Sequence, residues 1–193
     1  FSKWIEFTSD SGRTFVKKYI TLNNVDFNGY LPNLTFGFGI NGVKAFNKDL
    51  LIVYGDYGFI PAILYSTNGG TSFKLVFHSQ YDPLQIRTGV MDMIFPGDGD
   101  IGFAVDADRI LRTNDKGLSW SPVGIAPGSY LNNLQAWDYN VFAYSTGGVN
   151  ATLYYSRDYG ANWVSYSFPQ GTLNAAYFQS QWLGWANIGV DGV

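Results

Sequence analysis

Hydrophobic and polar positions follow one pattern that occurs four times along the chain. Each copy starts with a short apolar run, passes through Ser or Thr, then Asp or Asn, then Gly, and ends on an aromatic residue five positions after the Asx. The apolar runs are Trp4-Ile5 with Phe7, Ile63-Leu64-Tyr65, Ile110-Leu111 and Leu153-Tyr154-Tyr155. The polar parts are Thr8, Asp10, Gly12 and Phe15; Ser66, Asn68, Gly70 and Phe73; Thr113, Asp115, Gly117 and Trp120; and Ser156, Asp158, Gly160 and Trp163.

Each copy predicts a β-hairpin, because an apolar run, a turn and an aromatic-led run follow one another. The Asx side chain accepts bonds from nearby backbone N–H groups, and Gly supplies the positive φ of a tight turn. The aromatic residue is expected to fold back over the turn. Asn68 fits the same position because an amide oxygen accepts the same bonds. The carboxylates of Asp10, Asp115 and Asp158 are therefore predicted to be structural.

The frame Ser/Thr-x-Asp-x-Gly-x-x-Trp/Phe resembles the Asp-box, or BNR repeat, of sialidase-like β-propellers. The resemblance covers most of the chain and implies a propeller in which each repeat belongs to one blade. Sialidases, xyloglucan-degrading enzymes, sortilin-type receptors and photosystem assembly factors all carry such repeats. The resemblance therefore leaves the activity open, because a fold does not determine a function.

Strand signals fill the intervals between the turns, and no segment has a convincing helix period. The expected strands are residues 3–8, 14–20, 41–47, 50–55, 62–66, 72–78, 90–95, 101–105, 109–113, 118–123, 133–138, 140–145, 151–156, 162–168, 173–178 and 181–188. We therefore expect an all-β chain in which residues 1–193 form one β-propeller domain of four four-stranded antiparallel blades.

The chain is expected to start and end halfway through a blade. The anchors Asp10, Asn68, Asp115 and Asp158 lie 58, 47 and 43 residues apart, and the residues after Asp158 together with those up to Asp10 add an interval of 45. Pairing of the C-terminal strands with the N-terminal hairpin would close the ring and remove exposed strand edges. The alternative is that the chain is part of a larger propeller.

The composition of the chain argues against several classes of partner and cofactor. Aromatic residues make up 18% of the 193 residues and there are 23 Gly, which suits many short strands joined by tight turns. The net charge is −3 with scattered Lys and Arg, so no nucleic-acid partner is expected. No apolar run reaches membrane-spanning length, so no membrane insertion is expected. The absence of Cys and a single His, His78, argue against a metal site, and no phosphate-cradling loop indicates a cofactor.

Ligand contacts are expected in the loops at the end of the blades opposite the repeated turns, where sequence is free to vary. The segments are 21–40, 55–61, 79–89, 105–109, 125–133 and 145–151. The predicted ligand-binding residues are Tyr30, Asp56, Tyr57, Tyr81, Arg87, Arg109, Tyr130 and Asn133. Aromatic rings beside amides and a few charges would suit a sugar. For any single one of them, an ordinary loop role remains the alternative.

Catalysis by a glycosidase generally needs two carboxylates across the scissile bond. Asp56, Asp82, Asp106 and Asp108 could supply such a pair, and the catalytic candidates are Asp82, Asp106 and Asp108. The resemblance does not extend to the catalytic residues of sialidases. Their Arg-Ile-Pro motif has only Phe59-Ile60-Pro61 as a counterpart, the arginines are too few for a triad, and Glu6 is the only Glu.

These observations favour a non-catalytic recognition or scaffold propeller that presents a loop-built face to a glycan or protein partner. It would be a module of a larger surface, secreted or virion assembly, and therefore extracellular or at a cell or virion surface. The alternative is a glycoside hydrolase, sialidase-like or endo-glucanase-like, or a fragment of one. The oligomeric state is left open by the sequence.

Overall fold

The computed structural model describes residues 3–30, 37–79, 89–97, 99–106, 109–125, 130–146, 152–168 and 171–189. In these residues the chain forms strands and a single 3-10 helix, η1 (Leu22–Asn24), so the prediction of an all-β chain is confirmed. The strands fall into two compact units, unit 1 (Phe1–Val90) and unit 2 (Met91–Val193), which are described separately. The prediction of one domain stays a prediction.

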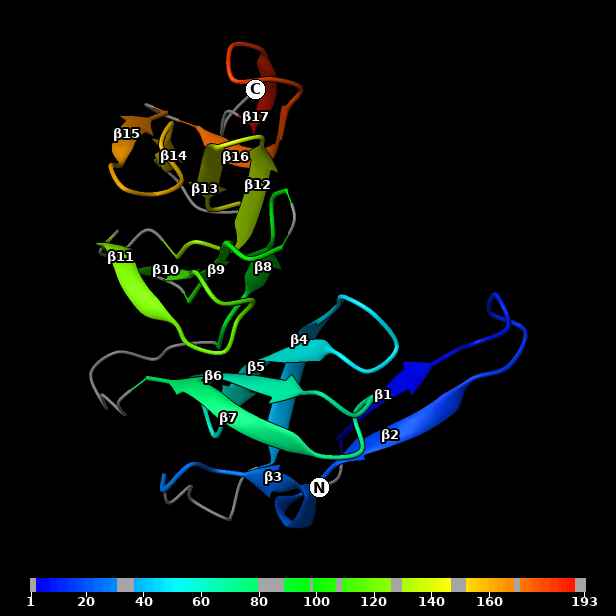
Figure 1. Cartoon of the computed structure of the whole chain (residues 1–193). Helices are drawn as coiled ribbons and strands as arrows, with labels where there is room; N and C mark the ends of the chain where they lie inside the picture. The colour runs from blue at the N-terminus through cyan, green and yellow to red at the C-terminus, as the bar shows by residue number, and fades with distance from the viewer. Residues whose placement is uncertain are drawn as a thin grey trace. The chain divides into compact units, whose positions relative to one another are not determined.

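Unit 1 is built on an antiparallel meander of four strands, with a separate hairpin before it (Figure 1). The hairpin pairs β1 with β2, and the meander pairs β4, β5, β6 and β7 in sequence order. Its strands are β1 (Lys3–Phe7), β2 (Val16–Ile20), β3 (Val25–Asp26), β4 (Phe38–Ala45), β5 (Leu51–Tyr57), β6 (Ile60–Ser66) and β7 (Phe73–His78).

Strand β3 was not expected, because residues 21–40 were interpreted as a connection. Val25 and Asp26 pair in parallel with β7 and extend the meander to five strands in the order β3-β7-β6-β5-β4. The amide of Asn24 holds this segment in place, since its Nδ2 donates to the carbonyls of Tyr19 (2.8 Å) and Thr71 (3.3 Å). This pairing provides hydrogen-bond partners for backbone groups at the outer edge of β7. No local pattern in the sequence indicates it, because the paired residues are distant in the chain.

The core of unit 1 lies on the meander. Strands β5 and β6 are buried on both faces, which explains why their sequences are almost continuously apolar. On one face the core cluster consists of Ile20, Phe38, Leu51, Val53, Tyr57, Ala62, Leu64, Phe73 and Leu75. Burial of aliphatic side chains of this size stabilises a fold by roughly 1.5–3 kcal/mol each.

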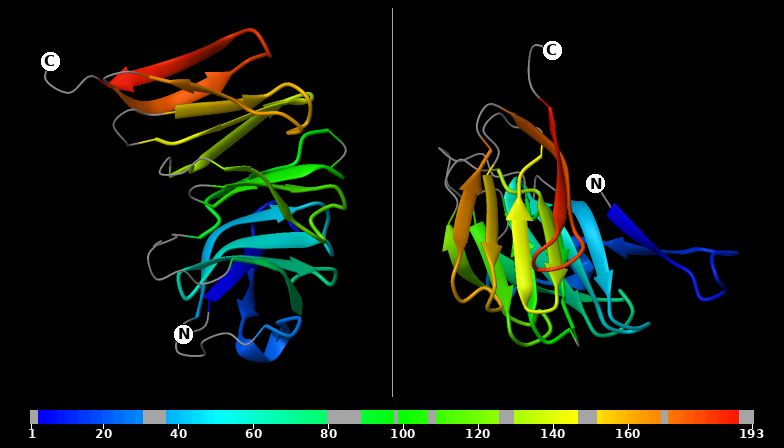
Figure 2. Two further views of the ribbon diagram at one scale, coloured as in Figure 1. Left: turned by 90° about the vertical axis from the view of Figure 1, so that its left-hand side faces the viewer. Right: turned by 90° about the horizontal axis from the view of Figure 1, so that it is seen from above.

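Unit 2 contains two four-stranded antiparallel sheets and one two-stranded sheet, all in sequence order (Figures 1 and 2). The first sheet is β8 (Asp92–Ile94), β9 (Gly102–Val105), β10 (Arg109–Thr113) and β11 (Ser121–Ile125). The second is β12 (Asn133–Trp137), β13 (Asn140–Tyr144), β14 (Thr152–Ser156) and β15 (Val164–Ser167). The two-stranded sheet is β16 (Thr172–Phe178) and β17 (Gly184–Gly189).

Side chains tie these three sheets to one another. Asp92 Oδ2 on β8 accepts the N–H of Leu134 on β12 at 2.8 Å. Gln135 on β12 reaches β16, where its Nε2 donates to the carbonyl of Ala176 (2.7 Å) and its Oε1 accepts the N–H of Phe178 (2.9 Å). The rings of Phe142 and Phe178 stack with centroids 3.8 Å apart. Buried polar links of this kind fix one arrangement of the sheets.

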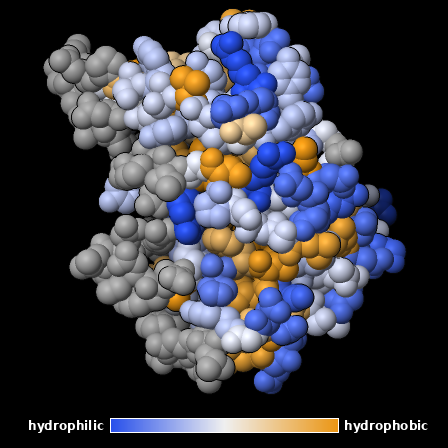
Figure 3. Space-filling model, turned by 60° about the vertical axis from the view of Figure 1, so that its left-hand side comes forward, coloured by the Kyte–Doolittle hydropathy of each residue, from blue (hydrophilic) through white to orange (hydrophobic). Residues whose placement is uncertain are grey.

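Large apolar side chains remain exposed on both two-stranded sheets. On the face displayed in Figure 3, apolar residues lie at the surface among hydrophilic ones. The exposed residues are Trp4, Phe7, Phe15, Val16 and Tyr19 in the hairpin of β1 and β2, and Tyr177, Trp182, Leu183 and Trp185 in the hairpin of β16 and β17. Each hairpin has the size of half a predicted blade.

Replacing Gln135 by Leu is expected to destabilise unit 2 by about 1–3 kcal/mol, because the N–H of Phe178 loses its acceptor and the carbonyl of Ala176 keeps only the hydroxyl of Tyr144 as a donor. The measurement is the urea midpoint of the variant. Gln179→Leu is the matched control, since Gln179 is exposed, and it should change stability by about 0.5 kcal/mol or less. Equal midpoints for Gln135→Leu and the wild type would contradict the role of this link.

Candidate functional site

The four repeated turns share one hydrogen-bond arrangement. In the fourth turn, Ser156 Oγ donates to Asp158 Oδ1 (2.7 Å) and accepts the N–H of Gly160 (2.8 Å). The same carboxylate accepts the backbone N–H (2.9 Å) and the side-chain amide (2.7 Å) of Asn162. Trp163 Nε1 donates to the carbonyl of Gly160 at 3.1 Å, which places its ring over the turn. Both oxygens of the carboxylate are thus engaged within the turn.

The first and third turns repeat these bonds. Thr8 and Thr113 donate to the Asp two positions on, at 2.8 and 2.7 Å, and accept the Gly N–H at 2.9 Å in both turns. The Gly residues of all four turns have φ between 76° and 87° (Gly12, Gly70, Gly117 and Gly160). A side chain is rarely tolerated in this region, so glycine is required there.

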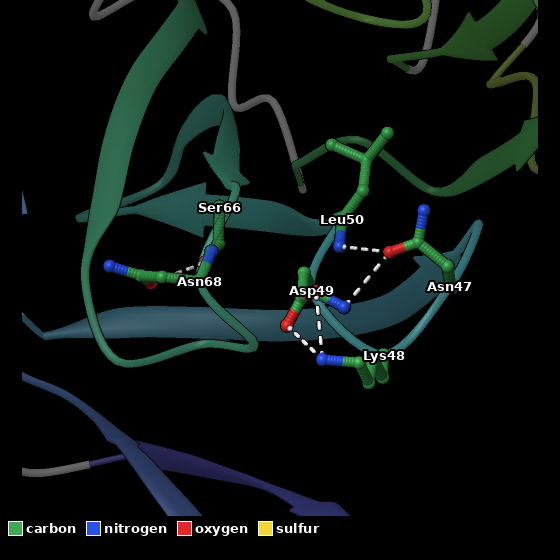
Figure 4. Close-up of polar contacts among 6 residues, drawn as sticks. All are labelled: Asn47, Lys48, Asp49, Leu50, Ser66 and Asn68. Carbon is green, nitrogen blue, oxygen red and sulfur yellow. Dashed lines mark hydrogen bonds and ion pairs between the residues drawn. The ribbon is translucent and has the colours of Figure 1, made fainter.

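The second turn uses an amide in place of a carboxylate. Asn68 Oδ1 accepts from Ser66 Oγ (3.0 Å) and from the N–H of Ser72 (2.9 Å), and its Nδ2 donates to Ser72 Oγ (2.8 Å). Figure 4 shows this turn beside the turn between β4 and β5, where Asn47 Oδ1 accepts the N–H groups of Asp49 and Leu50. The N–H of Gly69 donates to the carbonyl of Asp49 at 2.8 Å and joins the two turns.

The structure adds one position to the repeated pattern. The residue four positions after each Asx bonds to it through both its backbone N–H and its side chain, and it is always polar: Thr14, Ser72, Ser119 and Asn162. The sequence carried this signal, since all four residues precede the aromatic directly, but the predicted frame left the position unspecified.

These bonds lower the pKa of the turn carboxylates. A side-chain hydrogen bond from Thr14 is the main cause for Asp10, and one from Asn162 for Asp158, and both pKa values fall to about 2. For Asp115, burial raises the pKa, but bonds from Ser119 and Thr113 outweigh it and the pKa lies below its usual range. Hydrogen bonds to the charged form are known to act in this direction.

Stability is therefore expected to fall as the pH drops from about 4 to about 2. The pKa values of Asp10 and Asp158 are depressed in the folded chain. The stability that these carboxylates contribute is therefore complete above the unfolded pKa, near 4, and is lost as the pH falls toward the folded pKa of about 2. Thermal melts at pH 2–5 measure this. The double variant Asp10→Asn, Asp158→Asn should lose part of the slope, because an amide fills the position without titrating. An unchanged slope would contradict the assignment.

A cavity of about 80 Å³ opens in unit 1 and brings two predicted ligand residues, Tyr30 and Tyr57, to the same wall. It is lined by core residues of the meander and by the segment that runs from the end of β2 through η1 to Tyr30. The other lining residues are mostly apolar and comprise Ile20, Thr21, Leu22, Val25, Phe27, Gly37, Phe38, Ile60, Ala62, Leu64, Leu75 and His78. Ligand sites share this lining of apolar walls with a few polar groups, but they usually enclose about 300 Å³ or more, so this cavity has room only for a small group.

Three of the residues that line this cavity, Tyr30, Tyr57 and His78, are aromatic and carry polar atoms. Tyr57 is 7% exposed, and its hydroxyl has no hydrogen-bond partner in the part of the chain that the structure describes. Burial, with a smaller effect of Tyr30, raises the pKa of Tyr57. Tyr30 stacks on His78 with ring centroids 4.1 Å apart. Sequence reasoning missed His78 as a site residue, because nothing local connects the end of β7 with Tyr30.

Asp56 lies next to Tyr57 but serves the turn between β5 and β6. Its Oδ1 accepts the N–H of Phe59 at 3.1 Å. Phe59 has a φ of 69°, which is unusual for a residue with a side chain, so this bond helps to hold the turn. The candidate carboxylate is thus engaged locally.

Asp106 and Arg109 form an ion pair across the turn between β9 and β10. Asp106 is fully buried, and Arg109 binds it with two nitrogens, Nε at 3.0 Å from Oδ1 and an Nη against Oδ2. The backbone N–H of Asp106 also donates to the carbonyl of Arg109 at 3.2 Å. A bidentate pair of this kind fixes both side chains. Asp106 is therefore held as a structural anion rather than left facing a substrate.

The remaining predicted residues are not gathered into one site within the described ranges. Tyr130 is exposed at 69%, whereas Asn133 Nδ2 donates to Asn132 and to Thr146 Oγ1 (3.3 Å) beside it. Four candidates lie outside the described residues: Tyr81, Asp82, Arg87 and Asp108.

The described ranges contain neither a cluster of metal ligands nor a membrane-spanning helix. No group of three or more His, Cys, Asp or Glu there could hold a metal ion. Nor does that part of the chain contain a helix long and apolar enough to cross a membrane.

Comparison with known proteins gives fold neighbours only. No protein-family description matches the sequence, and no curated protein matches it. Among solved structures the chain is similar to the GH74 enzyme of Niastella koreensis, with 14% identity, a TM-score of 0.59, and coverage of 88% of this chain and 27% of that one. An ancestral GH74 enzyme matches with 13% identity, a TM-score of 0.52, and coverage of 69% and 19%. YCF48 bound to D1 peptide matches with 17% identity, a TM-score of 0.50, and coverage of 66% and 40%.

These neighbours are β-propellers, so the chain has a propeller-like all-β fold. It spans less than half the length of each of them. At such low identity the likeness does not extend to activity or ligand.

Proposed function

We propose that the chain is a β-propeller of four blades whose repeated turns are Asp-boxes, and that the ring closes between β17 and β1. The meander β4–β7 and the two four-stranded sheets of unit 2 each have the strand order of a blade. The hairpins β1–β2 and β16–β17 have two strands each and expose large apolar side chains. Joined edge to edge they would form the fourth blade and cover two sheet edges.

Hydrogen exchange tests the closure. In a closed ring both edges of β1 are paired, so all amides of Lys3–Phe7 should exchange about as slowly as those of β6, which is paired on both sides. In an open chain, the β1 amides that point away from β2 should exchange rapidly, like unpaired amides. Alternating fast and slow amides along β1 would therefore exclude four closed blades for this chain.

We further propose that this propeller is a non-catalytic recognition or scaffold module for a glycan or protein partner, at an extracellular, cell or virion surface. One observation carries the proposal: the described candidate carboxylates Asp56 and Asp106 are both committed to turns, whereas Tyr30 and Tyr57 share the wall of a cavity. The β5–β6 turn next to Tyr57 lies at the opposite end of the meander from the Asn68 turn. Similarity to YCF48 bound to a peptide supports a protein partner.

The alternative proposal is a glycoside hydrolase or a fragment of one. Its support is the similarity to two GH74 enzymes, of which the chain spans 27% and 19%. A hydrolase of this kind needs two carboxylates roughly 5–10 Å apart. Asp106 is neutralised by Arg109, which leaves Asp82 and Asp108 as its candidates.

We expect the purified chain to bind ligands on glycan or peptide arrays. We expect it to hydrolyse none of a panel of chromogenic glycosides tested in parallel. Tyr30→Ala and Tyr57→Phe should weaken the binding, whereas Tyr166→Ala, an exposed ring on β15, should leave it unchanged. Turnover that Asp82→Asn or Asp108→Asn abolishes would show that the chain is an enzyme.

A further inference from the structure

The hairpin turn of β16 and β17 lies against the fourth repeated turn, and an arginine lies between them. The guanidinium of Arg157 is 4.9 Å from the ring centroid of Trp182 and 5.5 Å from that of Tyr155. Contacts of an arginine with aromatic faces hold its planar group while leaving its N–H donors at the edge. Arg157 is therefore an exposed cation held in one position.

No carboxylate neutralises this cation within the described ranges. Arg157 forms no ion pair in that part of the chain, and the adjacent Asp158 uses its oxygens to accept bonds from Ser156 and Asn162. The chain offers no other charge nearby in sequence, because residues 159–190 contain no Lys, Arg, Asp or Glu. Arg157 thus has no ion-pair partner in the described ranges, and it lies beside an aromatic, charge-free hairpin; the one charge next to it in sequence is the carboxylate of Asp158, which is bonded within its own turn.

The surroundings of Arg157 are apolar and aromatic. Trp182 is 73% exposed and Leu183 49% exposed. Next to them, Tyr139 Oη donates to Gln181 Oε1 at 3.3 Å, which ties the hairpin turn to the sheet β12–β15. We call these six residues, Tyr139, Tyr155, Arg157, Gln181, Trp182 and Leu183, the Arg157 surface.

We propose that the Arg157 surface docks a protein segment that places a carboxylate opposite Arg157 and an aliphatic or aromatic side chain against Trp182 and Leu183. Trp, Tyr and Arg are the residues that contribute most of the affinity at protein interfaces, and charged residues are depleted at interface cores. The unneutralised charge of Arg157 sets the sign of the partner. Leu183 adds aliphatic contact area, which suits a peptide side chain better than a sugar ring.

This surface is distinct from the edge that would close the ring. Its members lie in the β16–β17 turn, in the β12–β13 turn and around the fourth repeated turn, at or beyond the strand ends, so pairing along β17 leaves them accessible. It is also distinct from the Tyr30–Tyr57 cavity, which belongs to unit 1. The inference therefore holds whether or not that cavity binds a ligand.

Selection of a phage-displayed library of short random peptides on the purified chain tests the proposal. The selected peptides should carry Asp or Glu next to an aliphatic or aromatic residue, and synthetic copies should change the fluorescence of Trp182. Arg157→Gln and Trp182→Ala should each weaken binding about tenfold or more, and higher salt should weaken it further. Peptides in which the acidic residue is replaced by its amide should bind the wild-type chain weakly. Their affinity should be about that of the acidic peptides for the Arg157→Gln variant.

Lys116→Gln is the matched control, because it removes one exposed charge of unit 2 that lies in the third repeated turn, outside this surface, and should leave the affinity unchanged. Unchanged thermal melts show that the variants fold. The proposal is overturned if no acidic motif is enriched, if Arg157→Gln binds the peptides as well as the wild type, or if acidic oligosaccharides alone bind in an Arg157-dependent manner.

Discussion

The fold depends on one hydrogen-bond arrangement, in which a hydroxyl and an Asx side chain close a turn around a glycine of positive φ. The hydroxyl both donates to the Asx and accepts the glycine N–H, so one side chain serves two partners. The arrangement recurs between β1 and β2, β6 and β7, β10 and β11, and β14 and β15. Because register in a hairpin is set by its turn, these four turns determine which residues of each strand face the core.

The same arrangement engages the acidic residues of the repeated turns in bonds within their own turns. A carboxylate that accepts three or more hydrogen bonds within its own turn is strongly biased toward the charged form and is poorly placed to accept a bond from a substrate. In our proposals, recognition belongs to side chains outside these bonds. The two side chains proposed for it are Tyr57 at the end of β5, which is buried, and Arg157 beside the fourth turn, which is exposed and charged.

Local signals in the sequence predicted the strands well, because each hairpin is encoded within about twenty residues by its apolar runs and its turn. What the sequence could not reveal depends on contacts between distant residues. The parallel pairing of Val25 with Phe73, the reach of Gln135 to Ala176, and the stacking of Tyr30 on His78 join segments without any shared local pattern. The candidate site shows the same limit: Tyr30 and Tyr57 were singled out as loop residues, but the apolar cavity between them arises only from packing.

Because its Asx residue is Asn68, the second repeated turn responds to acid differently from the other three. Three turns depend on a negative charge that acid removes, whereas the turn between β6 and β7 depends on a group that is neutral throughout. This turn also joins the turn between β4 and β5 through the bond from Gly69 to Asp49. The Asn68 turn and its link to the β4–β5 turn therefore contain no side chain whose protonation at low pH would remove these bonds.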